Sequence, residues 1–224
     1  MEIAASLLGA NLLNLEEDVR LAEKWGLRII HFDQMDGHFV PNIAFGPAFV
    51  SAIRPITRCI LDVHLMLSDP LRYLDAYAAA GADNITVHAE IEGDVPTVLN
   101  AIHARGIRTC VSLNPETEAE VLRPLLPYCD MILIMLVQPG FGGQTIREDC
   151  VKKITTVRKL IERTGRRIPI EVDGGIKRDN AERVLEAGAD ILVMGTGLYG
   201  EPDPETVIRE MKEACDAHFD RTRR

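Results

Sequence analysis

Eight short apolar segments recur along the chain, and each is separated from the next by a segment of helical character. They span residues 2–8, 28–35, 59–66, 84–90, 108–114, 131–137, 168–174 and 191–197. Nearly continuous runs of Ile, Val and Leu are typical of parallel strands covered on both faces. Strand–helix units at intervals of roughly 25 residues predict an α/β fold, a (β/α)₈ TIM barrel. An open, doubly wound sheet is the alternative.

The segments between the runs carry helix signals. Residues 14–26 have apolar residues at helical spacing, with Asn14 and Glu17 at the positions of a capping box. Asp69 and Pro70 predict the start of a further helix. Four of the runs follow a glycine that can turn the chain from a helix into the next strand: Gly26, Gly81, Gly106 and Gly188. We therefore expect one barrel domain over residues 1–224, with a short polar tail from about residue 217.

Composition excludes several classes of protein. A formal net charge of −9 argues against a dedicated binder of nucleic acid or of an anionic membrane. The five cysteines are far apart and form no CxxC motif, so neither a disulfide framework nor a structural zinc site is expected. The first residues lack a basic signal region, and no apolar run has the length of a membrane span. These features predict a cytoplasmic protein.

Polar residues stand late in three of the apolar runs, where a buried strand would not need them. His31 and Asp33 occur in one run, Asp62 and His64 in the next, and Asp173 near the end of the seventh. In a barrel the carboxyl ends of the strands surround one mouth, and active sites are built there. A polar group among Ile and Val is costly unless it is paired or bound to a metal.

Two imidazoles and two carboxylates, from His31, Asp33, His64 and Asp173, would form the ligand set of one divalent metal ion. Such mixed nitrogen and oxygen ligands suit zinc, iron(II), manganese or cobalt. The alternative for each histidine taken singly is a hydrogen-bonded core residue. Asp62 is expected to point away and support the ligands or a neighbouring strand, while His88 either contacts the ligands or packs in the core. Asp36 is expected to stabilise a turn.

Three glycine-rich loops follow the last three strands, at Gln138–Gln144, Asp173–Ile176 and Gly195–Gly200. Glycine lets backbone N–H groups approach an anion closely, and the loops after strands seven and eight are a recurrent phosphate site in these barrels. Turns also use glycine, but three such loops at one mouth predict a phosphate-bearing ligand. The longest of them, near Pro139–Asp149, is also a candidate lid.

At these residues the sequence resembles the ribulose-phosphate 3-epimerase family over nearly the whole chain. The motifs HFDQMDGHFVPN, FGPAFV, LDVHLM, AGADNITVH, LNPET, PGFGGQ and EVDGGI occur in family order. The resemblance implies a TIM barrel of the ribulose-phosphate-binding type. It also implies a metal-dependent epimerase that inverts C3 of a ketose phosphate, D-ribulose 5-phosphate to D-xylulose 5-phosphate. Separately, outward apolar patches on the barrel helices predict a homo-oligomer.

The same resemblance assigns roles to individual positions. Asp33 and Asp173 match the catalytic acid/base pair, and both belong with His31 and His64 to the metal ligands. Residues that match substrate and phosphate contacts are Ser6, His64, Gly140, Phe141, Gly142, Gly143, Gly174, Gly175, Gly195 and Thr196. Three methionines match a cluster that lines the site: Met35, Met66 and Met135.

Departures from the family pattern leave the sugar open. The positions are Gln34, Gly9, Asn11, Leu136, Gln138 and Thr196. One alternative is therefore a hexulose-phosphate 3-epimerase, such as one acting on D-allulose 6-phosphate. Decarboxylases and aldolases of related barrels usually need a lysine at a strand end, and none of the eight runs has one. A non-catalytic sugar-phosphate-binding barrel is the remaining alternative, and it would have no use for two opposed aspartates.

Overall fold

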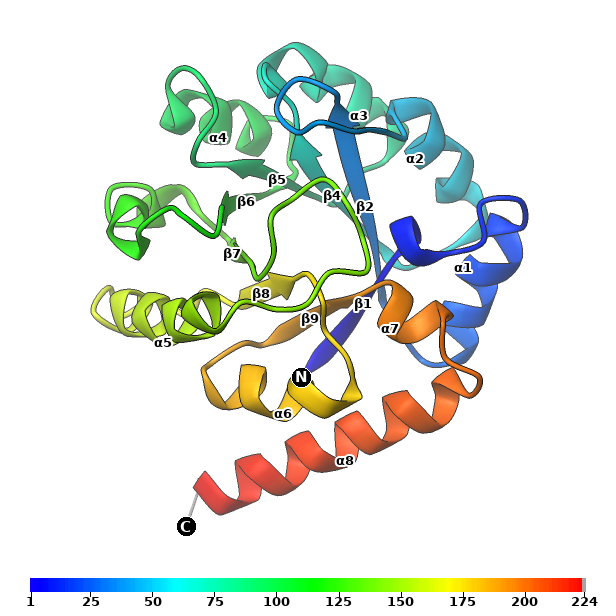
Figure 1. Cartoon of the computed structure of the whole chain (residues 1–224). Coiled ribbons are helices and arrows are strands. Elements are labelled where there is room, and N and C mark those ends of the chain that lie inside the picture. Colours follow the sequence, from blue (N-terminus) through cyan, green and yellow to red (C-terminus); the bar gives the residue numbers. More distant parts are fainter. Residues whose placement is uncertain (223–224) are drawn as a thin grey trace.

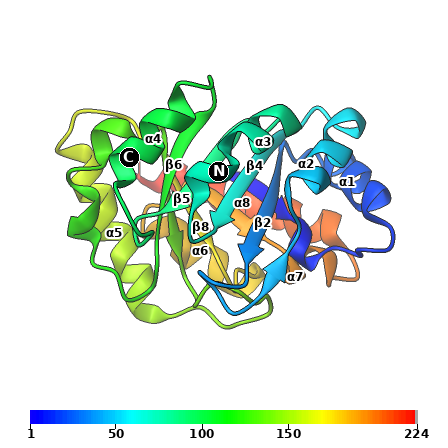
Figure 2. The ribbon, with the colours of Figure 1, turned by 90° about the horizontal axis from the view of Figure 1, so that it is seen from above.

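Eight parallel strands close into a barrel in the computed structural model, which describes the backbone of residues 1–222 and the side chains of residues 1–213. β1 pairs with both β2 and β9, so the order β1-β2-β4-β5-β6-β7-β8-β9 closes on itself. Helices surround this ring of strands (Figure 1), and the view turned by 90° shows the strands side by side within them (Figure 2). The closure confirms the TIM barrel and excludes the open sheet.

The chain forms its elements in regular alternation. The strands are β1 (Glu2–Ser6), β2 (Ile29–Asp36), β3 (Ile43–Ala44), β4 (Ile60–Met66), β5 (Asn84–His88), β6 (Arg108–Leu113), β7 (Met131–Met135), β8 (Ile170–Asp173) and β9 (Ile191–Met194). The α-helices are α1 (Leu15–Lys24), α2 (Pro47–Ile53), α3 (Leu74–Ala80), α4 (Val95–His103), α5 (Glu148–Glu162), α6 (Arg178–Glu186), α7 (Thr196–Tyr199) and α8 (Pro204–Thr222). Short 3₁₀ helices are η1 (Leu7–Gly9), η2 (Arg54–Ile56), η3 (Pro70–Tyr73), η4 (Ala119–Leu122) and η5 (Leu126–Tyr128).

Each of the eight predicted runs contains one strand of the barrel. The sequence did not predict β3, which pairs antiparallel with the end of β2. A pairing of two residues is too short to leave a periodic signal. Several predicted runs extend beyond the strand into the following loop, because apolar residues continue there. In the last run, Gly195 precedes α7 and Thr196 and Gly197 belong to that helix rather than to β9.

The helix signals are confirmed in part. Asn14 precedes α1 as expected, but its side chain donates to the Glu17 carboxylate rather than capping a backbone N–H, so no capping box forms. α3 begins at Leu74 and not at Pro70, because the tighter 3₁₀ turn η3 comes first. The four helix-ending glycines all have positive φ, as predicted: 75° at Gly26, 90° at Gly81, 73° at Gly106 and 116° at Gly188.

The last helix extends past the expected start of the tail, since α8 continues to Thr222. Residues 223–224, and the side chains of Cys215 and His218, lie outside the described part. The other four cysteines are buried free thiols, as the absence of a disulfide framework predicts: Cys59, Cys110, Cys129 and Cys150. Within residues 1–222, none of the helices combines the length and apolar composition needed to cross a bilayer.

Apolar residues fill both the space between the strands and the helices and part of the barrel interior. The larger cluster joins the outward faces of the strands to the helices. A smaller cluster closes the interior towards the amino ends of the strands and contains Ala4, Ile29, Cys110, Met131, Ile191 and Val193. Towards the carboxyl ends of the strands the interior is different, because polar side chains face inward there beside Met35, Met66 and Met135.

Candidate active site

Side-chain alternation along the parallel strands brings the predicted polar residues to one mouth. In β2, His31, Asp33 and Met35 face inward, because successive residues of a strand point to opposite faces. The register pairs His31 with Asp62, and Asp33 with His64, on neighbouring β4. Asp173 ends β8 and enters the same space.

The four predicted metal ligands come together. Candidate ligand atoms of His31, Asp33, His64 and Asp173 all lie within 4.8 Å of one another. Asp33 Oδ1 lies 3.5 Å from His31 Nε2 and 3.5 Å from His64 Nδ1. Neither ring nitrogen has a hydrogen-bond partner, although both are buried. Such unpartnered donor atoms, at a spacing compatible with metal–ligand bonds of about 2.0–2.2 Å, fit a divalent cation.

A second set of polar groups fixes the orientation of the two histidines. Asp62 Oδ2 lies 2.6 Å from His31 Nδ1, on the side of the ring away from Asp33. A carboxylate in this position holds the tautomer that leaves Nε2 free for a metal. His88 Nε2 lies 2.8 Å from His64 Nε2, so His88 contacts a candidate ligand directly. Asp62 thus supports the ligands as predicted, but it points into the barrel and not away from it.

The two aspartates have opposite pKa shifts. Burial, with the nearby Asp33 charge, raises the pKa of Asp173 to about 7. Burial would also raise the pKa of Asp33, but the adjacent His31 outweighs it and holds that pKa well below its usual range. Burial lowers the pKa of His64 to about 4, which keeps its ring neutral. Before a metal binds, the pair near pH 7 therefore contains an ionised Asp33 and an Asp173 carboxyl group that is about half protonated.

A further buried carboxyl group lies one layer below, on the same face of β8 as Asp173. Glu171 is fully buried, and neither of its oxygens has a hydrogen-bond partner. A carboxylate oxygen of Glu171 lies within 4.8 Å of those of Asp62 and of a ring nitrogen of His31. Burial, with the nearby Asp62 carboxylate, raises the pKa of Glu171 well above its usual range. The sequence reading missed this residue, although its place two before Asp173 in IEVD was a signal.

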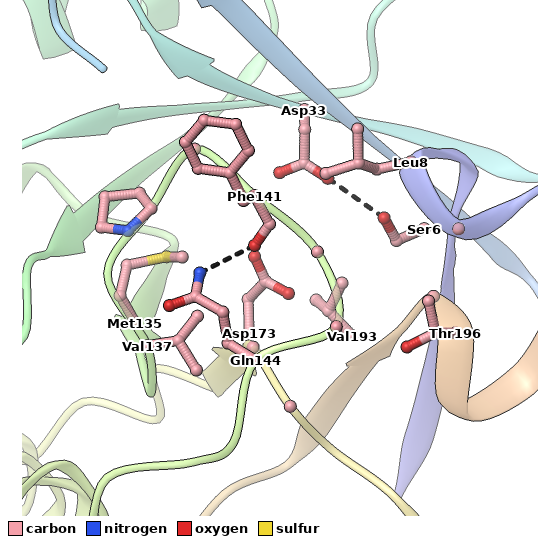
Figure 3. Close-up of a pocket in the computed structure, with 18 of the residues that line it drawn as sticks. Ser6, Leu8, Asp33, Met135, Val137, Phe141, Gln144, Asp173, Val193 and Thr196 are labelled. Carbon is pink, nitrogen blue, oxygen red and sulfur yellow. Dashed lines mark hydrogen bonds between the residues drawn. The ribbon is translucent and has the colours of Figure 1, made fainter. Parts of the chain in front are cut away.

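The mouth contains a cavity into which Asp33 and Asp173 point from facing sides (Figure 3). All of the predicted glycines line it, together with Phe141 and Thr196. Gly174 and Gly175 have φ of 109° and 68°, and a Cβ on Gly174 would lie 2.3 Å from Val137. The loop after β8 therefore requires glycine for its conformation and for its close packing.

The loop between β7 and α5 crosses the mouth (Figure 1) and limits the cavity to about 60 Å³. That is far below the ~300 Å³ at which small-molecule sites usually begin. Asn42 Nδ2 donates to Gly140 O at 2.7 Å, and the Gln144 amide donates to Gln138 O at 2.7 Å. The Gln144 amide also donates to Phe141 O at 2.8 Å (Figure 3). These bonds hold the loop closed. Asn42 and Gln144 were quoted within motifs but received no role from the sequence.

Other predicted residues are placed as follows. Ser6 Oγ donates to Asp33 Oδ2 at 3.0 Å (Figure 3) and so orients that carboxylate. The three methionines line the cavity: Met35, Met66 and Met135. His64 was also expected to contact substrate, but it is fully buried and does not line the cavity. It lies behind Asp33, where the strand register puts it.

Only two of the departures from the family pattern line the cavity, namely Gly9 and Thr196. Gly9 packs against the loop after β9, where an added Cβ would lie 2.4 Å from the Gly195 carbonyl carbon. Gln34 is buried outside the barrel interior, where its Oε1 accepts from Tyr77 at 3.1 Å. Cavity residues that the sequence reading did not single out are Leu8, Val137, Pro139, Gln144, Ile176, Val193 and Gly197.

Asp36 has the turn role that was expected of it. Its carboxylate accepts from the backbone N–H groups of His38, Phe39 and Ser68 at 2.7–2.9 Å. It thereby fixes the 37–42 loop above the mouth and joins it to the segment after β4. Asn42, which holds the neighbouring loop closed, belongs to the segment fixed in this way.

Several solved structures share the fold. A 3-hexulose-6-phosphate synthase superposes with a TM-score of 0.67 at 20% identity, covering 96% of this chain and 99% of that one. The phosphoribosyl anthranilate isomerase of Thermus thermophilus gives a TM-score of 0.65 at 18% identity and covers 97% of this chain and 99% of that one. Identities this low show the barrel fold alone.

Sequence comparisons are more specific. The family model described as "Ribulose-phosphate 3 epimerase family" matches residues 2–199. The ribulose-phosphate 3-epimerase of Bacillus subtilis is 41% identical over 213 residues, which is 95% of this chain and 98% of that protein. The enzyme of the same name from Synechocystis is 43% identical over 214 residues, covering 95% of this chain and 93% of that protein. The chain belongs to the ribulose-phosphate 3-epimerase family.

Proposed function

We propose that the protein inverts the configuration at C3 of a ketose phosphate, interconverting D-ribulose 5-phosphate and D-xylulose 5-phosphate. The observation that carries this proposal is the pair Asp33 and Asp173, which face one cavity with opposite pKa shifts. Epimerisation beside a ketone requires one group to remove a proton and a second group to return one from the other face. Family membership supports the same chemistry.

The two carboxyl groups exchange protons with C3 in a balanced sequence. The ionised carboxylate removes the C3 hydrogen as a proton, and the C3–H electron pair moves into the carbon framework towards the C2 carbonyl to give an enediolate. The neutral carboxyl group then donates its proton to C3 from the opposite face. The product has inverted configuration, and the proton has in effect passed from one aspartate to the other. The reverse reaction uses the same groups in exchanged roles.

One divalent metal ion, held by His31, Asp33, His64 and Asp173, fits the unpartnered donor atoms of this group. When bound, such an ion supplies positive charge that makes the hydrogen beside the ketone more acidic. Zinc, iron(II), manganese and cobalt all suit the donor set. Asp62 contributes by holding the His31 ring in position.

The remaining cavity residues would bind the substrate and exclude water. The glycines of the loops after β7, β8 and β9 allow the backbone to surround a phosphate group. Phosphate binding away from C3 would supply free energy for orienting the sugar. The methionines provide an apolar lining that shelters the charged intermediate. Since the 136–147 loop lies across the cavity, it must move to admit substrate.

A second candidate is epimerisation of a six-carbon ketose phosphate. The observation that favours it is that two of the departures from the family pattern, Gly9 and Thr196, line the cavity. A screen of pentulose 5-phosphates against hexulose 6-phosphates, with metal analysis of the same sample, separates the two. We expect the higher kcat/KM with D-ribulose 5-phosphate and about one metal ion per chain. If the metal-loaded protein turned over no ketose phosphate, both epimerase proposals would be wrong and a non-catalytic sugar-phosphate-binding protein would remain.

Homo-oligomer formation and a cytoplasmic location stay predictions from the sequence. Two apolar side chains that are largely exposed, Leu13 before α1 and Ile43 in β3, support self-association. Light scattering after size-exclusion chromatography tests this, and a monomer at all protein concentrations would contradict it.

A further inference from the structure

The opposite end of the barrel, where the strands begin, holds a second and much larger concavity. Its volume is about 980 Å³, and it is lined by residues at or next to the starts of β1, β2, β4, β6, β8 and β9. We call it the amino-end basin. None of its lining residues belongs to the candidate active site. A concavity of this volume is at the upper end of the range for small-molecule sites.

Arginines surround this basin. The pattern is visible in the sequence, where an arginine begins β6 or stands within three residues before β2, β4 and β8. The basin is lined by Arg28, Arg58, Arg108, Arg158 and Arg167, against only three acidic residues, Glu2, Glu23 and Asp190. The basin therefore has an excess of positive charge on a chain whose formal net charge is −9. Its charge is opposite in sign to that of the molecule as a whole.

Two of these arginines have structural partners and three do not. Arg28 pairs with Glu2, and Arg158 pairs with Asp190. Within the described side chains, the guanidinium groups of Arg58, Arg108 and Arg167 form no hydrogen bond or ion pair; they are exposed at the rim. Cations that share one concavity repel each other, so the basin gains free energy when a multivalent anion enters it.

The floor of the basin is apolar. Ile29 and Ile191 close the bottom of the barrel interior, with Ile60 packed against them. A ligand that fits the whole basin therefore combines an apolar body with several negative charges. Guanidinium groups match phosphate oxygens in geometry and bind them through two parallel hydrogen bonds. An acidic protein would fit a flat or convex surface better than a concavity of this size.

We propose that the amino-end basin binds an organic polyphosphate of nucleoside-triphosphate size, with its phosphates on Arg58, Arg108 and Arg167 and its ring system on the isoleucine floor. This site lies at the opposite end of the barrel from the active site, and its occupation does not depend on the epimerase reaction. The ligand undergoes no reaction at this site; binding depends only on its negative charge and its apolar surface.

Calorimetric titration of the metal-loaded protein with adenosine 5′-triphosphate tests the proposal. The test variant combines Arg58→Gln, Arg108→Gln and Arg167→Gln. The control variant removes equal charge from exposed residues outside the basin, with Arg72→Gln, Arg123→Gln and Lys152→Gln. We expect saturable binding to the wild type and the control, and affinity lower by roughly 10- to 100-fold in the test variant. Metal chelation and binding at the active site would be the same in all three proteins.

The titration would overturn the proposal if it showed no saturable binding to the wild type, or equal affinity in the wild type and the test variant. Inorganic triphosphate should bind less tightly than the nucleotide. Equal affinity would show that the ring system of the nucleotide does not bind to the isoleucine floor. Hydrogen–deuterium exchange of the wild type needs no variant. Nucleotide should protect segments 26–29, 58–60 and 167–169, whereas protection confined to 140–144 and 195–197 would place the anion in the active site instead.

Discussion

The two ends of this barrel are built from the same strands but are chemically opposite. At the carboxyl ends, imidazoles and carboxylates are buried between the strands and point at one another. At the amino ends, apolar residues fill the interior and exposed arginines surround it. Buried charged groups are costly, so a fold keeps them only where they bind or react, whereas exposed arginines cost little. The carboxyl ends of the strands are thus specialised for chemistry, whereas the amino ends provide stability through apolar packing and carry exposed positive charge.

Metal removal should produce the largest difference between the two ends. We expect the metal-free protein to lose turnover by roughly 10³-fold or more, because the cation supplies several kcal/mol at the transition state. Thermal stability should fall as well, since the four ligands lose their common partner. Activity assays before and after dialysis against a chelator, with re-addition of zinc, iron(II), manganese or cobalt, measure this. Full activity in protein shown to be metal-free would contradict the metal site.

Asp62→Asn should show how much the group that positions His31 contributes to metal binding, since Asp62 is not itself one of the four candidate ligands. Asparagine keeps the shape of aspartate but loses the charged acceptor for His31 Nδ1. We expect metal affinity to fall by about 10- to 100-fold, measured by competition with a chromogenic chelator. Asp130→Asn is the control, because its carboxylate accepts from Thr109 and contacts none of the candidate metal ligands. Equal metal affinity in the two variants would show that Asp62 has no role at the metal.

Arg158→Ala should lower stability and leave catalysis unchanged, as expected for a residue at the amino end of the barrel. Its guanidinium donates to Gly188 O at 2.7 Å and to Ile168 O at 3.2 Å, and it pairs with Asp190. We expect a loss of about 1–3 kcal/mol in the free energy of unfolding, from urea denaturation. The kcat/KM of the remaining folded protein should equal that of the wild type. A lower kcat/KM at full folding would couple the two ends and break the comparison.

Asp36 gives the smallest effect, and one that depends on pH. Burial raises the pKa of this carboxylate, but the N–H groups of Ser68, Phe39 and His38 outweigh it and lower the pKa to about 2. Because its pKa is lowered, the ionised carboxylate stabilises the fold fully above the usual aspartate pKa of about 3.9. This stabilisation is lost as the pH falls towards 2. We expect Asp36→Ala to cost about 1–2 kcal/mol at pH 7 and less at pH 3. A cost that is independent of pH would exclude the charged carboxylate as its source.

The sequence was informative where local pattern and position coincide. His31, Asp33, His64 and Asp173 were predictable as a group because each interrupts an apolar run, and a closed parallel barrel brings the strands together. His31 stands near the middle of its run and the other three nearer the carboxyl end. The glycines of the mouth were predictable for a related reason, since three glycine-rich loops follow the last three strands, whose carboxyl ends meet at one mouth. The barrel itself followed from the repeated alternation of the eight runs.

Features that depend on register were not predictable. The spacing of Glu171 and Asp173 puts both on one face of β8, but the approach of Glu171 to Asp62 depends on the offsets of the strands around the closed barrel, which the spacing does not encode. Asn42 and Gly140 are 98 residues apart, and their hydrogen bond depends on how two loops cross. The arginines at or before the starts of β2, β4, β6 and β8 line one basin only because the closed barrel brings those strand starts together.

The claim on which the enzymatic account depends is that Asp33 and Asp173 exchange protons with C3 from opposite faces. The direct measurement is deuterium incorporation at C3 from D₂O, for each epimer separately, by Asp173→Asn protein whose metal content is determined in the same sample. The account predicts that metal-loaded Asp173→Asn loses incorporation by about 10²- to 10⁴-fold for at least one epimer. Incorporation at the wild-type rate with both epimers would contradict it.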